Sequence, residues 1–200
     1  MGRFVYWMNT SLDLFIESDA AAPEEGGGDW LRITESLHRH FNERARALAL
    51  DVNGRIVYEI MERYWPAART DESSSEVERE YGRIWVEKPK VLVSNTRTSA
   101  GYNTRVIGGA DAMEQLARIR EEVEGDIGVG GATLATGLLH AGLLDELLLY
   151  VHPVILGRGR PLFDDDLERI ELDPLETQAF EAGVVMHRYA VRGARPLRSR

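Results

Sequence analysis

The chain has 200 residues, 44% of them hydrophobic, and a formal net charge of −9. This length and apolar content suffice for one well-packed domain and fall short of two ordinary ones. The acidic balance argues against a nucleic-acid partner, because such a surface needs clustered Lys and Arg. The absence of cysteine excludes disulfides, thiolate chemistry and iron–sulfur ligation. No apolar run reaches the roughly 18 residues of a membrane span and no signal pattern opens the chain, so we expect a soluble cytoplasmic protein without a membrane partner.

The N-terminal part alternates apolar and polar segments. Residues 3–9 (RFVYWMN) are typical of a strand that is buried on both faces. Residues 17–28 combine a proline, acidic residues and three glycines, so we expect a flexible loop. Asp29 suits an N-cap, and the apolar residues that follow recur at helical spacing as far as Leu48. The pattern therefore predicts an amphipathic helix over 30–48.

A short strand at 48–52 is predicted to turn at Asn53-Gly54 into a second helix, which Trp65-Pro66 would end. Asp111 with Glu114 resembles a capping box. Four further elements follow from the spacing of apolar residues: a helix at 76–87, strands at 90–95 and 104–107, and a helix at 112–123.

The segment 125–163 contains a short strand, the turn Gly130-Gly131, a helix, a long apolar strand and a second glycine turn. A strand, a glycine turn and a helix together present free backbone N–H groups and the positive end of a helix dipole, where a phosphate could bind. A simple tight turn explains the same glycines. The dinucleotide fingerprint G-x-G-x-x-G is not met, because Thr133 occupies its last glycine position.

After an acidic loop at 164–166, residues 183–191 predict a last strand, and we expect the basic tail 193–200 to be disordered. Strands separated by helical segments favour one α/β domain over 1–192 with a mainly parallel sheet. The two C-terminal strands have no strong helix between them, which predicts an antiparallel edge.

Ligands of such sheets bind at the carboxyl ends of the strands. Four predicted strand ends carry polar residues or glycines that are also ordinary turn composition: Ser11-Leu12-Asp13, Asn53-Gly54-Arg55, Ser94-Asn95-Thr96 and Gly130-Gly131-Ala132-Thr133. His38 and His40 would point to different faces of one helix, the other histidines lack ligand spacing, and the unspaced acidic triplet is typical of a solvated loop. We therefore expect no metal site.

Taken together and in this order, these segments resemble the dihydrofolate reductase-like superfamily. The resemblance is to the reductase domain of the bifunctional riboflavin-biosynthesis deaminase-reductase and its stand-alone relatives. It is carried by SLD at 11–13, GDWL at 28–31, GRIVYE at 54–59, VSNT at 93–96, GGATLATGLLHAGLLDEL at 130–147 and PVILGRGRPLF at 153–163.

The resemblance implies a three-layer α/β fold and an NADPH-dependent reductase. Such an enzyme transfers a hydride to a C=N or C=O carbon of a heterocyclic, pyrimidine- or pterin-like substrate, as 5-amino-6-(5-phosphoribosylamino)uracil reductase does. The cofactor-binding positions that it implies are Gly54 and Arg55 at the phosphates, Ser94, Asn95 and Thr96 at the adenosine ribose, and Val129, Gly130, Gly131, Ala132, Thr133 and Leu134 at the pyrophosphate. It also implies a cis peptide bond between Gly130 and Gly131, which costs about 3–4 kcal/mol outside proline.

At the substrate pocket the resemblance places Ser11 and Asp13, with Asp13 as the catalytic polar group and Trp30 as a wall. Relatives commonly have a threonine at the position of Val57 and an arginine at that of Asn95, so NADH is not excluded as cofactor. Two alternatives stay open: a non-catalytic nucleotide-binding or sensory domain, and a structural α/β subunit whose glycines only make turns. A homodimer through residues 146–152 and the last strand is open as well, since burial within one subunit explains these apolar segments equally.

Overall fold

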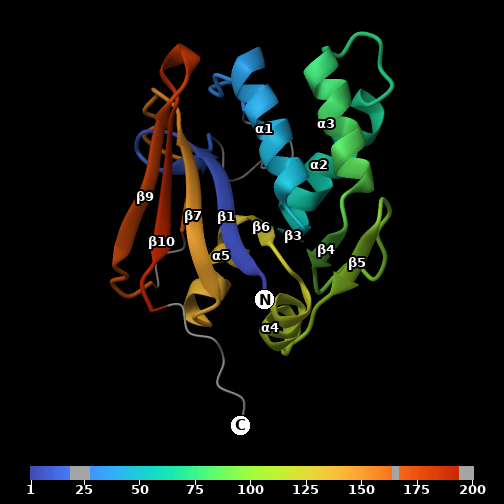
Figure 1. Ribbon diagram of the computed structural model, residues 1–200, viewed down its shortest axis with the longest axis vertical. Helices are drawn as coiled ribbons and strands as arrows, with labels where there is room; N and C mark the ends of the chain where they lie inside the picture. Colours follow the sequence, from blue (N-terminus) through green and yellow to red (C-terminus); the bar gives the residue numbers. More distant parts are fainter. Residues whose placement is uncertain (19–27, 164–166, 194–200) are drawn as a thin grey trace.

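Eight strands of the described residues form one sheet, in the order β5-β4-β3-β6-β1-β7-β10-β9 (Figure 1). The structure is a computed structural model, and it describes residues 1–18, 28–163 and 167–193. The strands of this sheet are β1 (Arg3–Thr10), β3 (Leu50–Gly54), β4 (Lys90–Val93), β5 (Thr104–Ile107), β6 (Asp126–Gly130), β7 (Leu144–Val151), β9 (Leu172–Ala179) and β10 (Val185–Val191). A separate pair joins β2 (Phe15–Glu17) to β8 (Arg160–Pro161).

The sheet is mainly parallel with an antiparallel edge, as the sequence predicts. Strands β5, β4, β3, β6, β1 and β7 pair in parallel, whereas β10 runs antiparallel to both β7 and β9. Strand β9 was not predicted, because it is polar, contains Pro174 and is largely exposed. A proline is tolerated in such an edge strand, where no further strand needs its missing N–H.

Helices cover the two faces of the sheet and complete three layers. On one face, α4 (Ala112–Glu122) and α5 (Ala132–His140) share a core with alternate residues of β1, β3 and β6, such as Phe4, Val52 and Val129. On the other face lie α1 (Glu35–Ala47), α2 (Arg55–Ala68) and α3 (Glu76–Glu87), with α3 packed against both α1 and α2 (Figure 1). The period of two along each strand thus assigns neighbouring residues to different layers.

The first helix begins later than predicted. Its N-cap is Thr34, whose hydroxyl accepts a hydrogen bond from the backbone N–H of Leu37, and not Asp29. The N-terminus shifts because this hydroxyl satisfies an N–H group that the first helical turn leaves open. Trp30 therefore lies in the segment before the helix, where it is 9% exposed.

Two further local predictions were wrong. Pro66 does not end α2, which continues to Ala68. A proline in the last turn removes only one backbone hydrogen bond, so the helix tolerates it. Asp111 makes no side-chain cap on α4 and instead accepts a hydrogen bond from the Gln115 amide, so the expected capping box is absent.

Strand β7 lies between β1 and β10, and its residues pack on both faces of the sheet within the chain. Burial within one chain therefore accounts for the apolar run at 146–152, and the homodimer stays a prediction. Most of the loop expected at 17–28, the acidic triplet at 164–166 and nearly all of the tail at 193–200 lie outside the described residues. Among the described residues, no helix has the length and apolar character needed to cross a bilayer.

Candidate active site

Two helices begin side by side at the carboxyl edge of the sheet. Strands β3 and β6 are parallel neighbours, with Asn53 opposite Gly130, and α2 and α5 start just after them. The N-cap residues are Gly54 and Gly131, and neither helix has a side-chain cap. The first backbone N–H groups of both helices therefore remain available to an anion, and both helix dipoles favour negative charge here.

A cavity of about 310 Å³ lies in front of these two helix starts. We call it the glycine-turn cavity. Its lining contains Gly54, Arg55, Gly131, Ala132, Thr133 and Leu134, together with Glu17 of β2 and Arg160 of β8. The Arg160 guanidinium donates a 2.6 Å hydrogen bond to the Thr133 hydroxyl, which ties the β2–β8 pair to the start of α5. Two arginines and two helix N-termini thus surround one cavity.

One acidic group also faces this cavity. The Oε2 atom of Glu17 is buried and has no hydrogen-bond partner among the described residues. Burial raises the pKa of Glu17, and the nearby Arg160 charge opposes that rise. This oxygen can accept a hydrogen bond from a ligand hydroxyl or amide.

The peptide bond between Gly130 and Gly131 is trans, which corrects the expected cis bond. Gly131 has φ +112° and ψ 130°, a conformation that glycine adopts without a Cβ clash. This conformation turns the chain from β6 into α5, so the turn does not require a cis bond. A Cβ on Gly130 would collide with the Asn53 side-chain oxygen, which explains the second glycine by packing.

A larger cavity of about 670 Å³ lies between the sheet and helices α1, α2 and α3. We call it the aromatic cleft, since Trp7, Phe41, Trp65, Tyr81 and Trp85 contribute to its walls. Its floor contains polar and small residues of β3 and β6, namely Asp51, Asn53, Gly128 and Gly130. The strand alternation explains this floor, because Leu50 and Val52 point into the opposite layer.

The two cavities meet at the glycine turn. Gly130 lines the aromatic cleft and Gly131 lines the glycine-turn cavity, while Val57 lines both. A ligand in each cavity would therefore approach the other at the peptide between the two glycines. Val129, the residue before them, also lines the aromatic cleft.

The Asp13 side chain accepts hydrogen bonds from two loops and lines neither cavity. Its carboxylate accepts hydrogen bonds from the Ser11 hydroxyl at 2.6 Å, from the backbone N–H of Gly157 at 2.7 Å and from that of Leu156 at 3.1 Å. These donors, the Ser11 hydroxyl first, lower the pKa of Asp13 to about 2. Neither Ser11 nor Asp13 is among the described residues that line the two cavities. The Asp13 carboxylate thus joins two loops, and its role at the substrate stays a prediction.

Trp30 packs its edge against the His152 ring, with 5.4 Å between ring centroids. The Nδ1 atom of His152 accepts a hydrogen bond from the backbone N–H of Arg32, so the ring proton is on Nε2 and is donated to Asn9. Burial lowers the pKa of His152 to about 4, so the ring is neutral near pH 7. Trp30 itself does not line the aromatic cleft, but the following Leu31 does. Trp30 therefore anchors the segment from which Leu31 reaches the aromatic cleft.

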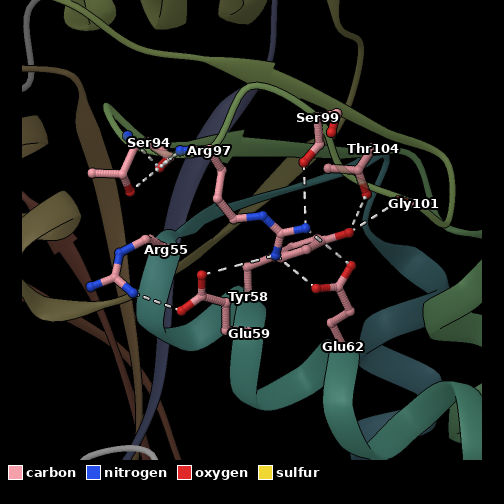
Figure 2. Close-up of polar contacts among 10 residues, drawn as sticks. Arg55, Tyr58, Glu59, Glu62, Ser94, Arg97, Ser99, Gly101 and Thr104 are labelled. Atoms are coloured by element: carbon pink, nitrogen blue, oxygen red, sulfur yellow. Dashed lines mark hydrogen bonds and ion pairs between the residues drawn. The ribbon is translucent and has the colours of Figure 1, made fainter.

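The turn after β4 is shaped by its own side chains. The Ser94 hydroxyl accepts hydrogen bonds from the backbone N–H groups of Thr96 and Arg97, and the Asn95 side-chain oxygen accepts one from Gly109. Figure 2 shows that the Arg97 guanidinium points to Glu62, 2.7 Å away, above α2. This arginine is thus engaged by a carboxylate, and the Ser94-Asn95-Thr96 turn does not line either cavity.

Sequence reasoning missed several residues of the site. Asp51 was overlooked and Asn53 was assigned to a turn, because the strand was expected to end at Val52, so the face that the two residues share was not recognised. Strand alternation over residues 50–54 would have revealed them. Arg160 stands in the quoted motif PVILGRGRPLF, but nothing in the motif shows that β8 folds back to the glycine turn.

A family model for the RibD C-terminal domain matches residues 8–186. This is nearly the whole chain. The protein belongs to the RibD C-terminal domain family. The family agrees with the resemblance inferred from the motifs.

Three similar proteins illustrate the range of this likeness. The uncharacterized protein YyaP of Bacillus subtilis is 28% identical over 184 residues, which are 92% of each chain. A protein of Shewanella sp. PV-4, provisionally assigned to riboflavin biosynthesis, has a crystal structure with a TM-score of 0.72 at 19% identity, covering 95% of this chain and 99% of that one. Dihydrofolate reductase of Enterococcus faecalis gives a TM-score of 0.60 at 13% identity, covering 95% and 96%. These structures show that this RibD-type domain has the dihydrofolate reductase-like fold.

Proposed function

We propose that the protein is a nicotinamide-dependent reductase of a heterocyclic substrate. The cofactor, NADPH with NADH as the alternative, would bind in the glycine-turn cavity, and the substrate would bind in the aromatic cleft. The observation that carries the proposal is the meeting of the two cavities at Gly130, Gly131 and Val57. Hydride transfer needs two ligands whose reacting atoms approach each other while the rest of each is held apart.

The residues of the glycine-turn cavity fit a dinucleotide. Backbone N–H groups at the starts of α2 and α5 would hold phosphate oxygens, and each uncapped helix start contributes roughly 0.3–1 kcal/mol toward an anion. Arg55 and Arg160 add positive charge, although Arg55 is also 2.7 Å from Glu59. The Glu17 Oε2 atom, which has no partner among the described residues, would accept a hydrogen bond from the cofactor. A similar fold supports this assignment, since the Enterococcus faecalis dihydrofolate reductase was crystallised with NADP(H).

The bound nicotinamide would supply the hydride, and the protein would orient the two ligands and keep water from the reacting carbon. Five aromatic rings in the cleft walls suit a flat substrate that stacks between them. Reduction also requires a proton. Asp13 is ionised near neutral pH and lines neither cavity, so we assign the delivery of this proton to a water in the cleft.

The proposal is tested by titrating the protein with NADPH and NADH while following the nicotinamide fluorescence, and then by following cofactor oxidation with pterin, pyrimidine and quinone-like substrates. We expect saturable binding of the reduced cofactor and its oxidation in the presence of a heterocyclic substrate. Gly131→Val should weaken cofactor binding, because a β-branched residue cannot adopt the φ of Gly131 without strain. The surface change Glu72→Gln serves as the matched control and should leave binding unchanged.

Saturable binding without oxidation of the cofactor across all substrates would favour the non-catalytic nucleotide-binding domain. Failure of both cofactors to bind the folded protein would contradict the proposed function and favour a structural subunit. Circular dichroism of the same samples establishes that the protein and its Gly131→Val variant are folded.

A further inference from the structure

The floor of the aromatic cleft contains one carboxylate, that of Asp51. Asp51 is the second residue of β3 and lies directly opposite Gly128 of β6 in the strand register. A Cβ on Gly128 would come within 2.5 Å of the Asp51 Oδ1 atom. The glycine therefore leaves the space that the carboxylate occupies, and a larger residue at 128 would push it from the floor.

No donor among the described residues makes a hydrogen bond or an ion pair with the Asp51 carboxylate. Two lysines influence it electrostatically, but both ammonium groups are bound to backbone carbonyls. Lys88 donates to the carbonyls of Arg46 and Leu48, and Lys90 donates to those of Trp85 and Lys88. Asp51 thus differs from the other carboxylates of the cleft lining, since Glu78 is held by Ser75 and Glu35 by Arg39.

An unpartnered carboxylate in such a place is costly to the folded protein. Burial raises the pKa of Asp51 to about 6, while the Lys88 and Lys90 charges lower it in part. The phenol of Tyr81, from α3, also feels the Asp51 charge, and His38 from α1 lines the same cleft. The Asp51 side chain is half-buried and lines the cleft, and ionisable groups with shifted pKa values in clefts cluster at functional sites.

The position of Asp51 in β3 determines which part of a bound ligand its carboxylate would contact. Asn53, two residues further along β3, lies opposite Gly130 at the meeting point of the cavities. Two strand residues span roughly 7 Å, about the width of a small ring system. A flat ligand with its reacting edge near Gly130 would therefore present its far edge to Asp51. The carboxylate is too far from the reacting carbon to act on it and is well placed to recognise the ring.

We propose that Asp51 is a substrate-recognition residue that accepts paired N–H hydrogen bonds from the far edge of a flat heterocycle in the aromatic cleft. The preferred ligands carry a ring N–H beside an exocyclic amino group, an amidine-like edge, because a carboxylate accepts two parallel N–H bonds in a bidentate manner. Rings that present only carbonyl oxygens at this edge would be repelled by the carboxylate. The inference rests on the proposed function in placing the substrate in this cleft.

The experiment uses three probes of the same size, which are benzamidine, benzamide and benzoate. Their binding to the full chain without cofactor is measured by calorimetry and by tryptophan fluorescence, since three of the four tryptophans, Trp7, Trp65 and Trp85, line the cleft. We expect benzamidine to bind about tenfold more tightly than benzamide, because only the amidinium makes charge-assisted hydrogen bonds, and benzoate to bind most weakly. Benzamidine affinity should fall as the pH drops below about 6, where Asp51 becomes protonated.

The matched variants are Asp51→Asn and Glu78→Gln, which neutralise two carboxylates of the same cleft without a change of shape. Asp51→Asn should remove the preference for benzamidine, and Glu78→Gln should keep it. Equal binding of benzamidine and benzamide by the native protein, or an unchanged preference in Asp51→Asn, would overturn the inference. If Asp51→Asn does not fold, the pH dependence of benzamidine binding to the native protein decides, and a flat profile between pH 5 and pH 7 would overturn it.

NADPH binding by Asp51→Asn separates this inference from the proposed function. We expect this variant to bind NADPH as the native protein does, since Asp51 does not line the glycine-turn cavity. Lost ring preference with intact NADPH binding supports both proposals. Absent NADPH binding in the native protein contradicts the proposed function, whereas the probe result still decides the role of Asp51.

Discussion

Asp13 and Asp51 are two aspartates with opposite surroundings. Asp13 stands in a recognisable motif, accepts three hydrogen bonds and has its pKa lowered to about 2. Asp51 stands in no motif, has no donor among the described residues and has its pKa raised to about 6. Hydrogen-bond donors stabilise the charged form of a carboxylate and burial disfavours it, so the two groups shift in opposite directions.

The carboxylate in the motif is held by the loops around it, while Asp51 has no donor among the described residues, which is why we propose that it binds a ligand. The contributions of the two groups to stability therefore depend on pH in opposite ways. A raised pKa means that the folded state holds its proton more tightly than the unfolded state, so the contribution of Asp51 to stability falls as the pH rises through about 4 to 6. A lowered pKa means that the contribution of Asp13 is present above about pH 4 and is lost as the pH falls toward 2.

The largest expected effect is that of Asp51→Asn on stability. At pH 7–8 this variant should be more stable than the native protein by about 2–3 kcal/mol, because the amide removes a charge that desolvation disfavours, the same cause that raises the pKa from 3.8 to about 6. Urea unfolding at pH 8 and at pH 4 measures the difference, which should nearly vanish at pH 4. A destabilised variant at pH 8 would show that the Asp51 charge has partners and would contradict the comparison.

Gly128→Ala should have the next largest effect. The new methyl group would lie within 2.5 Å of Asp51 Oδ1 and 2.7 Å of the Leu48 side chain, and such crowding costs about 1–3 kcal/mol. Thermal unfolding measures the loss, and benzamidine binding should weaken because the carboxylate is displaced. The control is Gly101→Ala, since a Cβ at Gly101 meets no atom within 4 Å. Equal stability of the two variants would mean that the cleft floor accommodates the added methyl group without strain.

A smaller effect is expected for Asp13→Asn. The amide cannot accept the hydrogen bonds of Ser11, Leu156 and Gly157 as a carboxylate does, so the loops that Asp13 joins should open more often. Faster amide hydrogen exchange at Leu156 and Gly157 measures this, and the destabilisation should disappear as the pH falls toward 2. Unchanged exchange together with a large loss of turnover would contradict this expectation and support the catalytic role predicted from the motif.

The smallest expected effect is that of Ser11→Ala on the titration of Asp13. The Ser11 hydroxyl is the main cause of the lowered pKa, so its removal should move the pKa of Asp13 upward toward its usual value. The carboxyl carbon signal in an NMR titration reports this shift. The titration of Asp51 serves as the internal control and should not change, since Ser11 makes no contact with it.

Much of the fold was predictable from the sequence, and half of the candidate site was not. Alternating strands and helices indicate the parallel sheet, and the glycines before α2 and α5 mark the glycine-turn cavity, because local backbone demands leave a local signal. The aromatic cleft has no comparable local signal in the sequence. It depends on helices α1, α2 and α3 packing against one face of β3, a long-range arrangement that a shift of two residues in the predicted strand conceals.

The predictions for Asp13 and Trp30 illustrate a limit of motifs. Their motifs indicated the fold correctly, but a motif does not reveal whether a polar group is used by the protein or left for a ligand. Only the positions of Leu156 and Gly157, far along the chain, show that the Asp13 carboxylate is already bound.

The most direct test of the account is amide hydrogen exchange with and without NADPH. We expect protection at the first residues of α2 and α5, around Arg55 and Ala132 to Leu134, because their backbone N–H groups would bind the cofactor phosphates. Residues of the cleft floor such as Asp51 should stay unchanged until a ring ligand is added. Saturating NADPH that protects neither helix start would contradict the central claim that the glycine turn holds the cofactor.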